Sequence, residues 1–289
     1  MKIRYTNPLG RVLELDAWPD RKDYILQSWE GFGEVPVTLQ TSKSAYQDGV
    51  TLVDQLLEPR HLSLEVVLYG PSKQHVYDKR RFIQNIFNPK LGLGKLEWIQ
   101  PNGDVYAINV IPEGSPSFPA GEGKSNSHQI AMINLMAPDP AWLDTSDNEL
   151  LVSSVIGKFT FPISFPTQMG ALDNERIITN RGDMPTPVRI IFNGPAENPK
   201  IANETTGDFV KVARTLLDDE QLIVDTTFGA KRVTFIDKDG VETNAFGFID
   251  LESQFWWLEV GDNKIVYTSD SGGSAATVHL FFKQRYVGV

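Results

Sequence analysis

The sequence predicts a mainly β protein with a single helix. The 23 Gly and 18 Pro residues are scattered along the 289-residue chain, as turns between many short strands would scatter them. Residues 61–70 alternate apolar and polar side chains, which is typical of a half-buried antiparallel strand. Only residues 73–87 have apolar residues at helical spacing, and the second half of the chain has almost no such pattern.

The first half reads as short strands around that helix. Strands are expected at 24–29 and 35–39, before a polar stretch that contains the turn Asp48-Gly49. The 61–70 strand should bury its even-numbered apolar residues, which are Leu62, Leu64, Val66 and Leu68. The helix should begin after Ser72 as N-cap and end at Asn88-Pro89. Further strands are expected at 95–99, 105–110 and 129–135, the first two joined by Asn102-Gly103.

The second half predicts an all-β sandwich or jelly roll, because turn signals separate several short strands. These strands are expected at 185–192, 231–236, 254–260, 264–267 and 276–286. We place the boundary near 143–150, which gives domains of residues 1–145 and 146–289. Trp142, just after Pro138-Asp139-Pro140, is interpreted as a buried anchor at this boundary.

Charge and composition exclude several classes of protein. The net charge is −10, with 14 basic and 19 acidic residues in 1–150 and 13 and 18 in the rest, so neither half is a basic nucleic-acid module. There is no cysteine for a disulfide or a thiolate metal site. No run approaches the roughly 20 apolar residues of a membrane span, and the first residues do not resemble a signal peptide. We expect a soluble protein made without export.

Motifs for catalysis or cofactors are weak. The four histidines, His61, His75, His128 and His279, form no metal-binding spacing. Residues 123–125 (Gly-Lys-Ser) resemble the end of a phosphate loop, but Phe118 stands where the first glycine is needed. No Gly-x-Ser-x-Gly elbow occurs. We therefore predict no enzyme activity and no catalytic, cofactor-binding or metal-binding residue.

Trp256 and Trp257 are the candidate contact residues. Neighbouring strand residues point to opposite faces, so one indole should face the core and the other outward. An outward Trp on a β-sandwich can stack on a sugar ring, but aromatic residues are also enriched at interfaces between domains or subunits. The pair is therefore a candidate contact for carbohydrate or for an interface, and the interface is favoured.

Short motifs follow one another in a defined order over residues 24–289. In the first half they are 24–26, 31–33, 48–49, 59–64, 80–83, 88–89, 92–96 and 137–142. In the second half they are 180–183, 187–190, 261–265 and 285–289. In this order the chain resembles the distal tail protein family of long-tailed, non-contractile phages that infect Gram-positive bacteria, including prophages.

The resemblance implies a structural role in the virion, at the tail tip or baseplate, with subunits made in the bacterial host cytoplasm. Members form hexameric rings that join the tail tube to the tip. Their N-terminal domain is a β-sandwich-like ring domain with a helix and a β-arm that reaches the neighbour, and their C-terminal domain is a galectin-like sandwich. The arm would lie at 36–57 or at 112–127, both long, polar and poor in core residues.

The implied partners are further copies of the chain, the major tail tube protein, tail-tip or tail-associated proteins, and receptor-binding or baseplate proteins. DNA would pass through the ring without specific binding, and no membrane or cofactor is implied. A charge of −10 suits such a conduit, whose bore we expect to be acidic. The alternative function is adsorption by binding host cell-wall carbohydrate, and a cell-wall hydrolase is disfavoured because no motif supports it.

Replacing Trp142 by Ala tests its assignment as an anchor. Removing a buried indole leaves a cavity, so we expect the free energy of unfolding to fall by about 3–5 kcal/mol. Equilibrium urea unfolding of the variant measures this, and a loss below about 1 kcal/mol would show that Trp142 is not an anchor.

Overall fold

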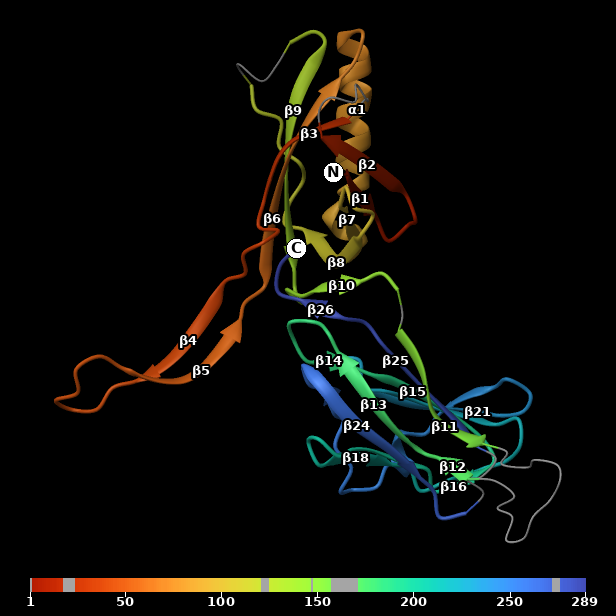
Figure 1. Cartoon of the computed structure of the whole chain (residues 1–289). Helices are drawn as coiled ribbons and strands as arrows, with labels where there is room; N and C mark the ends of the chain where they lie inside the picture. Colours follow the sequence, from red (N-terminus) through yellow and green to blue (C-terminus); the bar gives the residue numbers. More distant parts are fainter. Residues whose placement is uncertain (1, 18–23, 121–124, 147, 157–170, 272–275) are drawn as a thin grey trace. The chain divides into compact units, whose positions relative to one another are not determined.

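A computed structural model describes residues 2–17, 24–120, 125–146, 148–156, 171–271 and 276–289 (Figure 1). The chain forms two compact units, one of residues 1–145 with 286–289 and one of residues 146–285. Both are built mostly of strands, and the described residues contain one α-helix. The predicted mainly β class is confirmed.

The first unit is a nine-stranded sheet with a separate hairpin. The strand order is β26-β10-β8-β7-β1-β2-β3-β6-β9, and β8 also pairs with β9, so the sheet closes on itself. Its strands are β1 (Lys2–Thr6), β2 (Val12–Ala17), β3 (Tyr24–Glu30), β6 (Arg60–Tyr69), β7 (Gly94–Ile99), β8 (Val105–Pro112), β9 (His128–Ala137), β10 (Trp142–Asp144) and β26 (Arg285–Tyr286). The hairpin consists of β4 (Val37–Ser42) and β5 (Thr51–Leu57).

The core of this unit lies between the sheet and helix α1 (Lys73–Ile86). The even-numbered apolar residues of β6 are at most 2% exposed, as their alternation predicts. The helix buries Val76, Ile83 and Ile86, and a short 3-10 turn, η1 (Pro89–Leu91), follows it. Ser72 holds the N-cap position, but its hydroxyl pairs with His75 Nδ1 at 2.9 Å and makes no side-chain cap bond.

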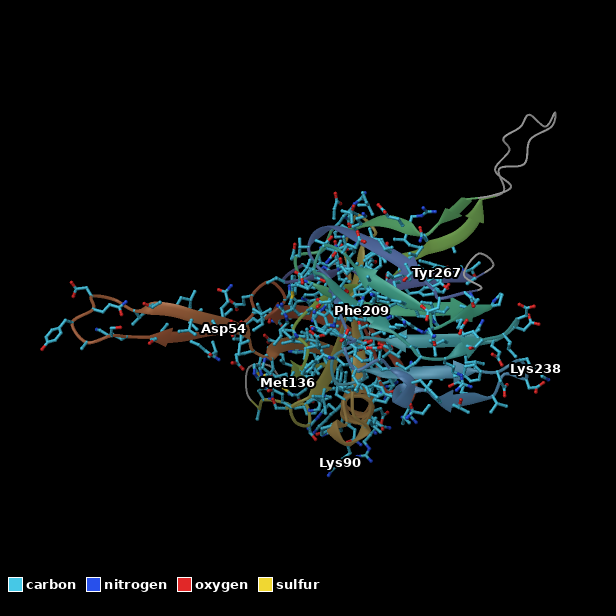
Figure 2. All side chains as sticks on the ribbon, turned by 90° about the horizontal axis from the view of Figure 1, so that it is seen from below. Asp54, Lys90, Met136, Phe209, Lys238 and Tyr267 are labelled. Carbon is cyan, nitrogen blue, oxygen red and sulfur yellow. The ribbon has the colours of Figure 1, made fainter. Side chains whose placement is uncertain are left out.

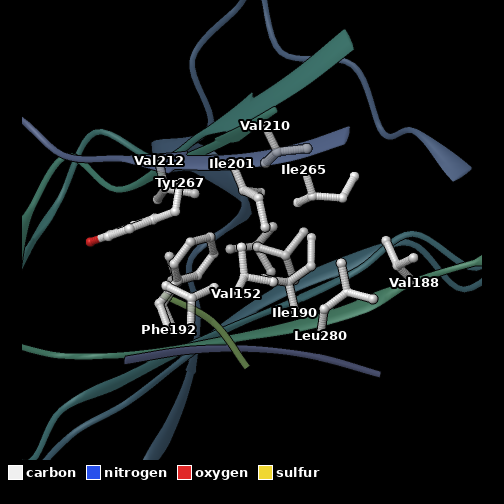
Figure 3. Close-up of a cluster of buried hydrophobic side chains, with 14 of the residues drawn as sticks. Val152, Val188, Ile190, Phe192, Ile201, Val210, Val212, Ile265, Tyr267 and Leu280 are labelled. Carbon is white, nitrogen blue, oxygen red and sulfur yellow. The ribbon is translucent and has the colours of Figure 1, made fainter. Parts of the chain in front are cut away.

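The second unit is a sandwich of two main sheets whose apolar side chains meet between them (Figure 3). The seven-stranded sheet has the order β12-β11-β25-β15-β20-β21-β22, and the four-stranded sheet has the order β13-β24-β17-β18. Ile190 and Phe192 from the first sheet face Ile201, Ile265 and Tyr267 from the second. This contact of two inner faces is the predicted sandwich core.

The strands of the larger sheet are β11 (Asn148–Ile156), β12 (Ala171–Asp173), β15 (Arg189–Asn193), β20 (Gln221–Asp225), β21 (Arg232–Ile236), β22 (Glu242–Asn244) and β25 (Thr277–Phe282). Those of the smaller sheet are β13 (Glu175–Asn180), β17 (Lys200–Asn203), β18 (Asp208–Lys211) and β24 (Gly261–Thr268). Two short pairs complete the unit, β14 (Thr186–Pro187) with β23 (Trp257–Leu258) and β16 (Ala196–Glu197) with β19 (Thr215–Leu216). A 3-10 turn, η2 (Phe246–Phe248), follows β22.

The largest local difference from the sequence-based expectation lies around residues 254–263. Only Trp257 and Leu258 of the expected 254–260 strand form a strand, and the expected turn at 261–263 opens β24 instead. Asn263 is a buried residue within β24. Its amide donates to the carbonyls of Glu259 and Gly261, and its Oδ1 accepts from the Glu259 amide, so a local turn held by this side chain separates Leu258 from β24. Separately, no described helix is long and apolar enough to cross a membrane.

Burial of Tyr5 makes the stability of the first unit sensitive to high pH. Tyr5 is 1% exposed and stacks on Phe87 with ring centroids 4.4 Å apart. Burial raises the pKa of its hydroxyl from 10.0 to about 12. Below the lower value the hydroxyl is protonated in both states, whereas between the two values it ionises only in the unfolded chain. The free energy of unfolding should therefore fall by up to about 2–3 kcal/mol across this window.

Urea unfolding at a series of pH values on both sides of this window measures the effect, with Tyr5→Phe as the comparison. The variant keeps the ring but has no titrating hydroxyl, so its stability should decline less steeply than that of the wild type. Equal slopes for the two proteins would contradict the assignment.

Candidate interaction site

The hairpin of β4 and β5, here called the arm (residues 37–57), lies apart from the core of its unit. Every residue of both strands is exposed, and Figure 1 shows the pair extending away from the closed sheet. In Figure 2 the label Asp54 marks this hairpin, whose side chains project from the ribbon. The two strands contact each other, with six paired positions and one bulge after Gln40.

One face of the arm is apolar. Val37 lies opposite Leu57, and Thr41 lies opposite Leu52, so with Leu39 these residues share a face of the ribbon. The four large residues of this set, defined as the apolar face of the arm, are 36–58% exposed; they are Val37, Leu39, Leu52 and Leu57. The opposite face is mostly polar, with Thr38, Gln40 and Asp54, and its one large apolar residue is Leu56. A face of this kind on a two-stranded ribbon is suited to contact with another protein surface.

The tip of the arm is held by its own polar side chains. Gln47 accepts a hydrogen bond from the Ser44 amide at 3.0 Å and donates to Thr51 Oγ1 at 2.9 Å. Tyr46 is fully exposed and has a left-handed backbone, with φ of 63°. The turn therefore keeps a defined form even though little of it is buried.

The base of the arm is fixed to the sheet by Arg60, which begins β6. Arg60 is fully buried, and its guanidinium donates only to backbone carbonyls. Three of them, of Gly31, Phe32 and Glu34 at 2.7–3.1 Å, belong to the segment that enters the arm. The other two belong to Pro140, at 2.9 Å, and to Val287 in the last residues of the chain.

No carboxylate among the described residues pairs with Arg60. Burial accordingly lowers the pKa of Arg60, although a guanidinium stays charged in proteins. Five carbonyl dipoles take the place of a counter-ion and of water, which is the condition for keeping a charge buried. The side chain of Arg60 thus joins three parts of the unit: the segment that enters the arm, strand β6 that follows the arm, and the last residues of the chain.

Close packing completes the base. Phe32 is 4% exposed and contacts the rings of Trp98 and Trp142, with centroids 4.5 and 5.3 Å away. Trp142 is fully buried, and its indole nitrogen donates to the Phe32 carbonyl at 3.0 Å. Gly31 has φ of 83°, and a Cβ there would lie 2.0 Å from the His61 carbonyl oxygen, so no other residue fits.

The two other tryptophans named from the sequence lie in the second unit. Trp256 is 3% exposed and belongs to the core, whereas Trp257 is partly exposed. The Trp257 indole nitrogen donates to the Thr226 carbonyl at 3.0 Å, and the Arg285 guanidinium lies 5.3 Å from its ring.

The remaining motifs of the sequence lie apart from the arm base. His61 pairs with Glu113 at 2.8 Å, and His279 pairs with Glu149 at 2.9 Å, and all four side chains are at least partly exposed. Among the residues that the structure describes, no three His, Asp or Glu side chains are grouped as metal ligands would be. Residues 123 and 124 of the Gly-Lys-Ser motif lie outside the described residues.

Two family models match the chain, and together they cover most of it. The model described as "Phage tail protein RIFT-related domain" matches residues 20–136, in the first unit. The model described as "Siphovirus-type tail component, C-terminal domain" matches residues 181–286, in the second. The chain belongs to the distal tail protein family of siphophages. This distal tail protein is therefore a component of the siphophage tail.

Solved structures share the whole fold of this distal tail protein. The crystal structure of the SPP1 Dit protein, described as a paradigm of the hub adsorption apparatus in phages that infect Gram-positive bacteria, matches with a TM-score of 0.70 over 98% of each chain at 12% identity. Chains of the phage p2 baseplate in its activated conformation, with Ca and with Sr, match with TM-scores of 0.56 at 10% and 11% identity. These matches cover 100% of this chain and 100% and 99% of the others. No curated protein sequence matches in a direct search.

Two features of the site were not found from sequence. The arm was expected to be polar at either of two places, but residues 37–57 form it with an apolar face, while the described part of 112–127 packs on the sheet through Phe118 and the Ser117–Met132 bridge. The role of Arg60 was missed because a lone Arg after a Pro carries no pattern. Its signals are its place in the 59–64 motif and its position as the first residue of a strongly alternating strand, and neither indicates burial.

Replacing Arg60 by Met should destabilise the protein by about 4 kcal/mol, because it leaves several buried carbonyls without donors. Arg4→Met is the matched control. Arg4 also makes several polar contacts in the first unit, to Glu14 and Glu97, but it is partly exposed and should cost under about 1 kcal/mol. Urea unfolding compares the two, and similar losses would contradict the role given to Arg60.

Proposed function

We propose that six copies of this distal tail protein form a closed ring through head-to-tail contacts made by the arm, and that the ring joins the tail tube to the tail tip. The single observation that carries this is the uncovered apolar face of the arm. A separate two-stranded ribbon is marginally stable in water, and apolar side chains along one face are stabilised when a partner covers them.

A head-to-tail contact fits the asymmetry of the arm. The arm of one copy would lie on a different surface of the next copy, so each copy both gives and receives one arm. Contacts of this heterologous type close into a ring when the rotation per subunit divides a full turn. The rigid base at Arg60 supports this, because it fixes the direction in which each arm leaves its unit.

The partners proposed beyond the ring are the major tail tube protein on one side and tail-tip, receptor-binding or baseplate proteins on the other. DNA would pass through the ring without specific contacts. The charge of −10 per copy supports this, since a strongly basic wall would hold phosphates. A structural role of this kind needs no catalysis, and we propose none.

Adsorption through host cell-wall carbohydrate is the second candidate function. Burial of Trp256 in the core removes it as a stacking platform, and Trp257 is engaged by Thr226 and Arg285. A pocket of the second unit that Trp257 lines together with other aromatic residues is the observation that favours this function.

Light scattering and negative-stain images at high protein concentration test the ring. We expect particles of about 194 kDa, six copies of 32.3 kDa, with a central hole. Leu39→Asp places a charge on the apolar face and should cost about 2 kcal/mol at each contact, raising the concentration needed for rings roughly 30-fold.

Thr38→Asp is the matched control, because it adds the same charge one residue away on the polar face, opposite Leu56 and not opposite the charged Asp54. It should form rings as the wild type does. Equal behaviour of the two variants, or a wild-type protein that stays monomeric both alone and with tail tubes, would contradict the proposal.

A further inference from the structure

We propose that the second unit binds a neutral saccharide in the pocket between the turn at Phe228 and the segment 255–259. The pocket measures about 410 Å³, which lies in the range of small-molecule sites. It is lined by aromatic, proline and charged residues: Pro185, Asp208, Phe228, Lys231, Phe255, Trp256, Trp257 and Glu259. This inference rests on the second candidate function, adsorption through carbohydrate, and does not depend on ring formation.

Phe228 is an exposed ring on a rigid turn. It is 82% exposed, which is costly for an aromatic side chain without a partner. The Ala230 amide donates to the Thr227 carbonyl at 3.0 Å, and Gly229 has φ of 75°, so Phe228 occupies a tight turn. The Thr227 amide also donates to Asp225 Oδ1 at 3.0 Å. Little backbone entropy is left to lose when a ligand covers this ring.

The foot of the same turn is tied to the pocket wall. Thr226 is fully buried, and its hydroxyl bonds to the Val188 amide and carbonyl at 2.9 and 3.1 Å. Its carbonyl accepts the Trp257 indole N–H. Phe228 and Trp257 are therefore held in a fixed relation, on elements far apart in the sequence. Aromatic groups that are held in place before binding are typical of a ligand site.

A third ring and three charges complete the pocket. Phe255 packs partly against the core, and the Lys231 ammonium lies 5.4 Å from its centroid. Asp208, Glu259 and Lys231 form no ion pair with any described residue, in a protein whose charges are often paired elsewhere. Two free carboxylates and one ammonium can accept and donate hydrogen bonds to a ligand.

These groups favour one ligand chemistry. The apolar C–H face of a sugar ring fits against aromatic rings, while its hydroxyls can donate to carboxylates and accept from an ammonium. Two carboxylates against one ammonium disfavour polyphosphates and nucleic acids, which need an excess of cations. Pro185 and Pro187 disfavour an added peptide strand along β14, because proline has no amide hydrogen to offer.

Titration of the full-length protein with glucose, lactose, maltose and the disaccharide of N-acetylglucosamine tests the proposal, with Trp fluorescence and saturation-transfer NMR as readouts. We expect at least one of these sugars to bind with a Kd on the order of 1 mM or below. Glucose 6-phosphate serves as the charged comparison and should bind more weakly than glucose.

Phe228→Ala should weaken binding about tenfold, because it removes an exposed stacking ring. Leu251→Ala is the matched control, since Leu251 is a fully exposed apolar residue of the same unit outside the pocket. Both residues are on the surface, so both variants should unfold at the wild-type urea midpoint. Asp208→Asn keeps the shape of the side chain, and its weaker binding would assign the carboxylate as an acceptor.

Failure of every sugar to bind, or equal binding by wild type and Phe228→Ala, would overturn the proposal. So would an equal loss in Leu251→Ala. Light scattering on the same samples reports ring formation separately, so failure of the saccharide site and failure of the ring are distinguishable. Rings that bind no sugar would leave the hub function standing alone.

Discussion

The buried guanidinium of Arg60 is the interaction on which the first unit depends. One charge holds five carbonyls from three separate parts of the chain: the entry to the arm, the segment before β10 and the last residues. A carboxylate partner would have neutralised the charge, but it would have bound at one place. Backbone carbonyls instead bind the guanidinium from several segments. Their hydrogen bonds offset the free-energy cost of removing Arg60 from water, and they also fix the positions of these segments.

The first unit thus has a closely packed base and an arm whose apolar face is uncovered. Phe32, Trp98 and Trp142 pack tightly at the base of the arm, whereas no residue of β4 or β5 is buried. If the base were loose, the arm would sample many directions and would lose conformational entropy when a partner surface covers its apolar face. Because its base is fixed, the arm loses less conformational entropy on binding, and its direction is set before it meets a partner.

Regular elements were predictable from sequence where side-chain pattern and backbone period agree. The alternation of β6, the stripe of α1 and the mainly β class all follow from residues close in the chain. The burial of Arg60 does not, because it depends on carbonyls from residues 31–34, 140 and 287 that only the fold brings together. The apolar face of the arm was missed for a related reason: leucines and valines at strand spacing are the same in a core strand and in an interface strand. Phe228 follows no sequence pattern, and only the fold brings it into one pocket with Trp257.

The path of the chain end has a further consequence. The second unit is inserted between Thr145 and Tyr286, and its two connections leave from β10 and β26, which are neighbours in one sheet. Insertion at adjacent strands leaves the host sheet intact whatever the insert contains. The second unit can therefore differ in size or sequence without breaking a strand pair of the first unit's sheet.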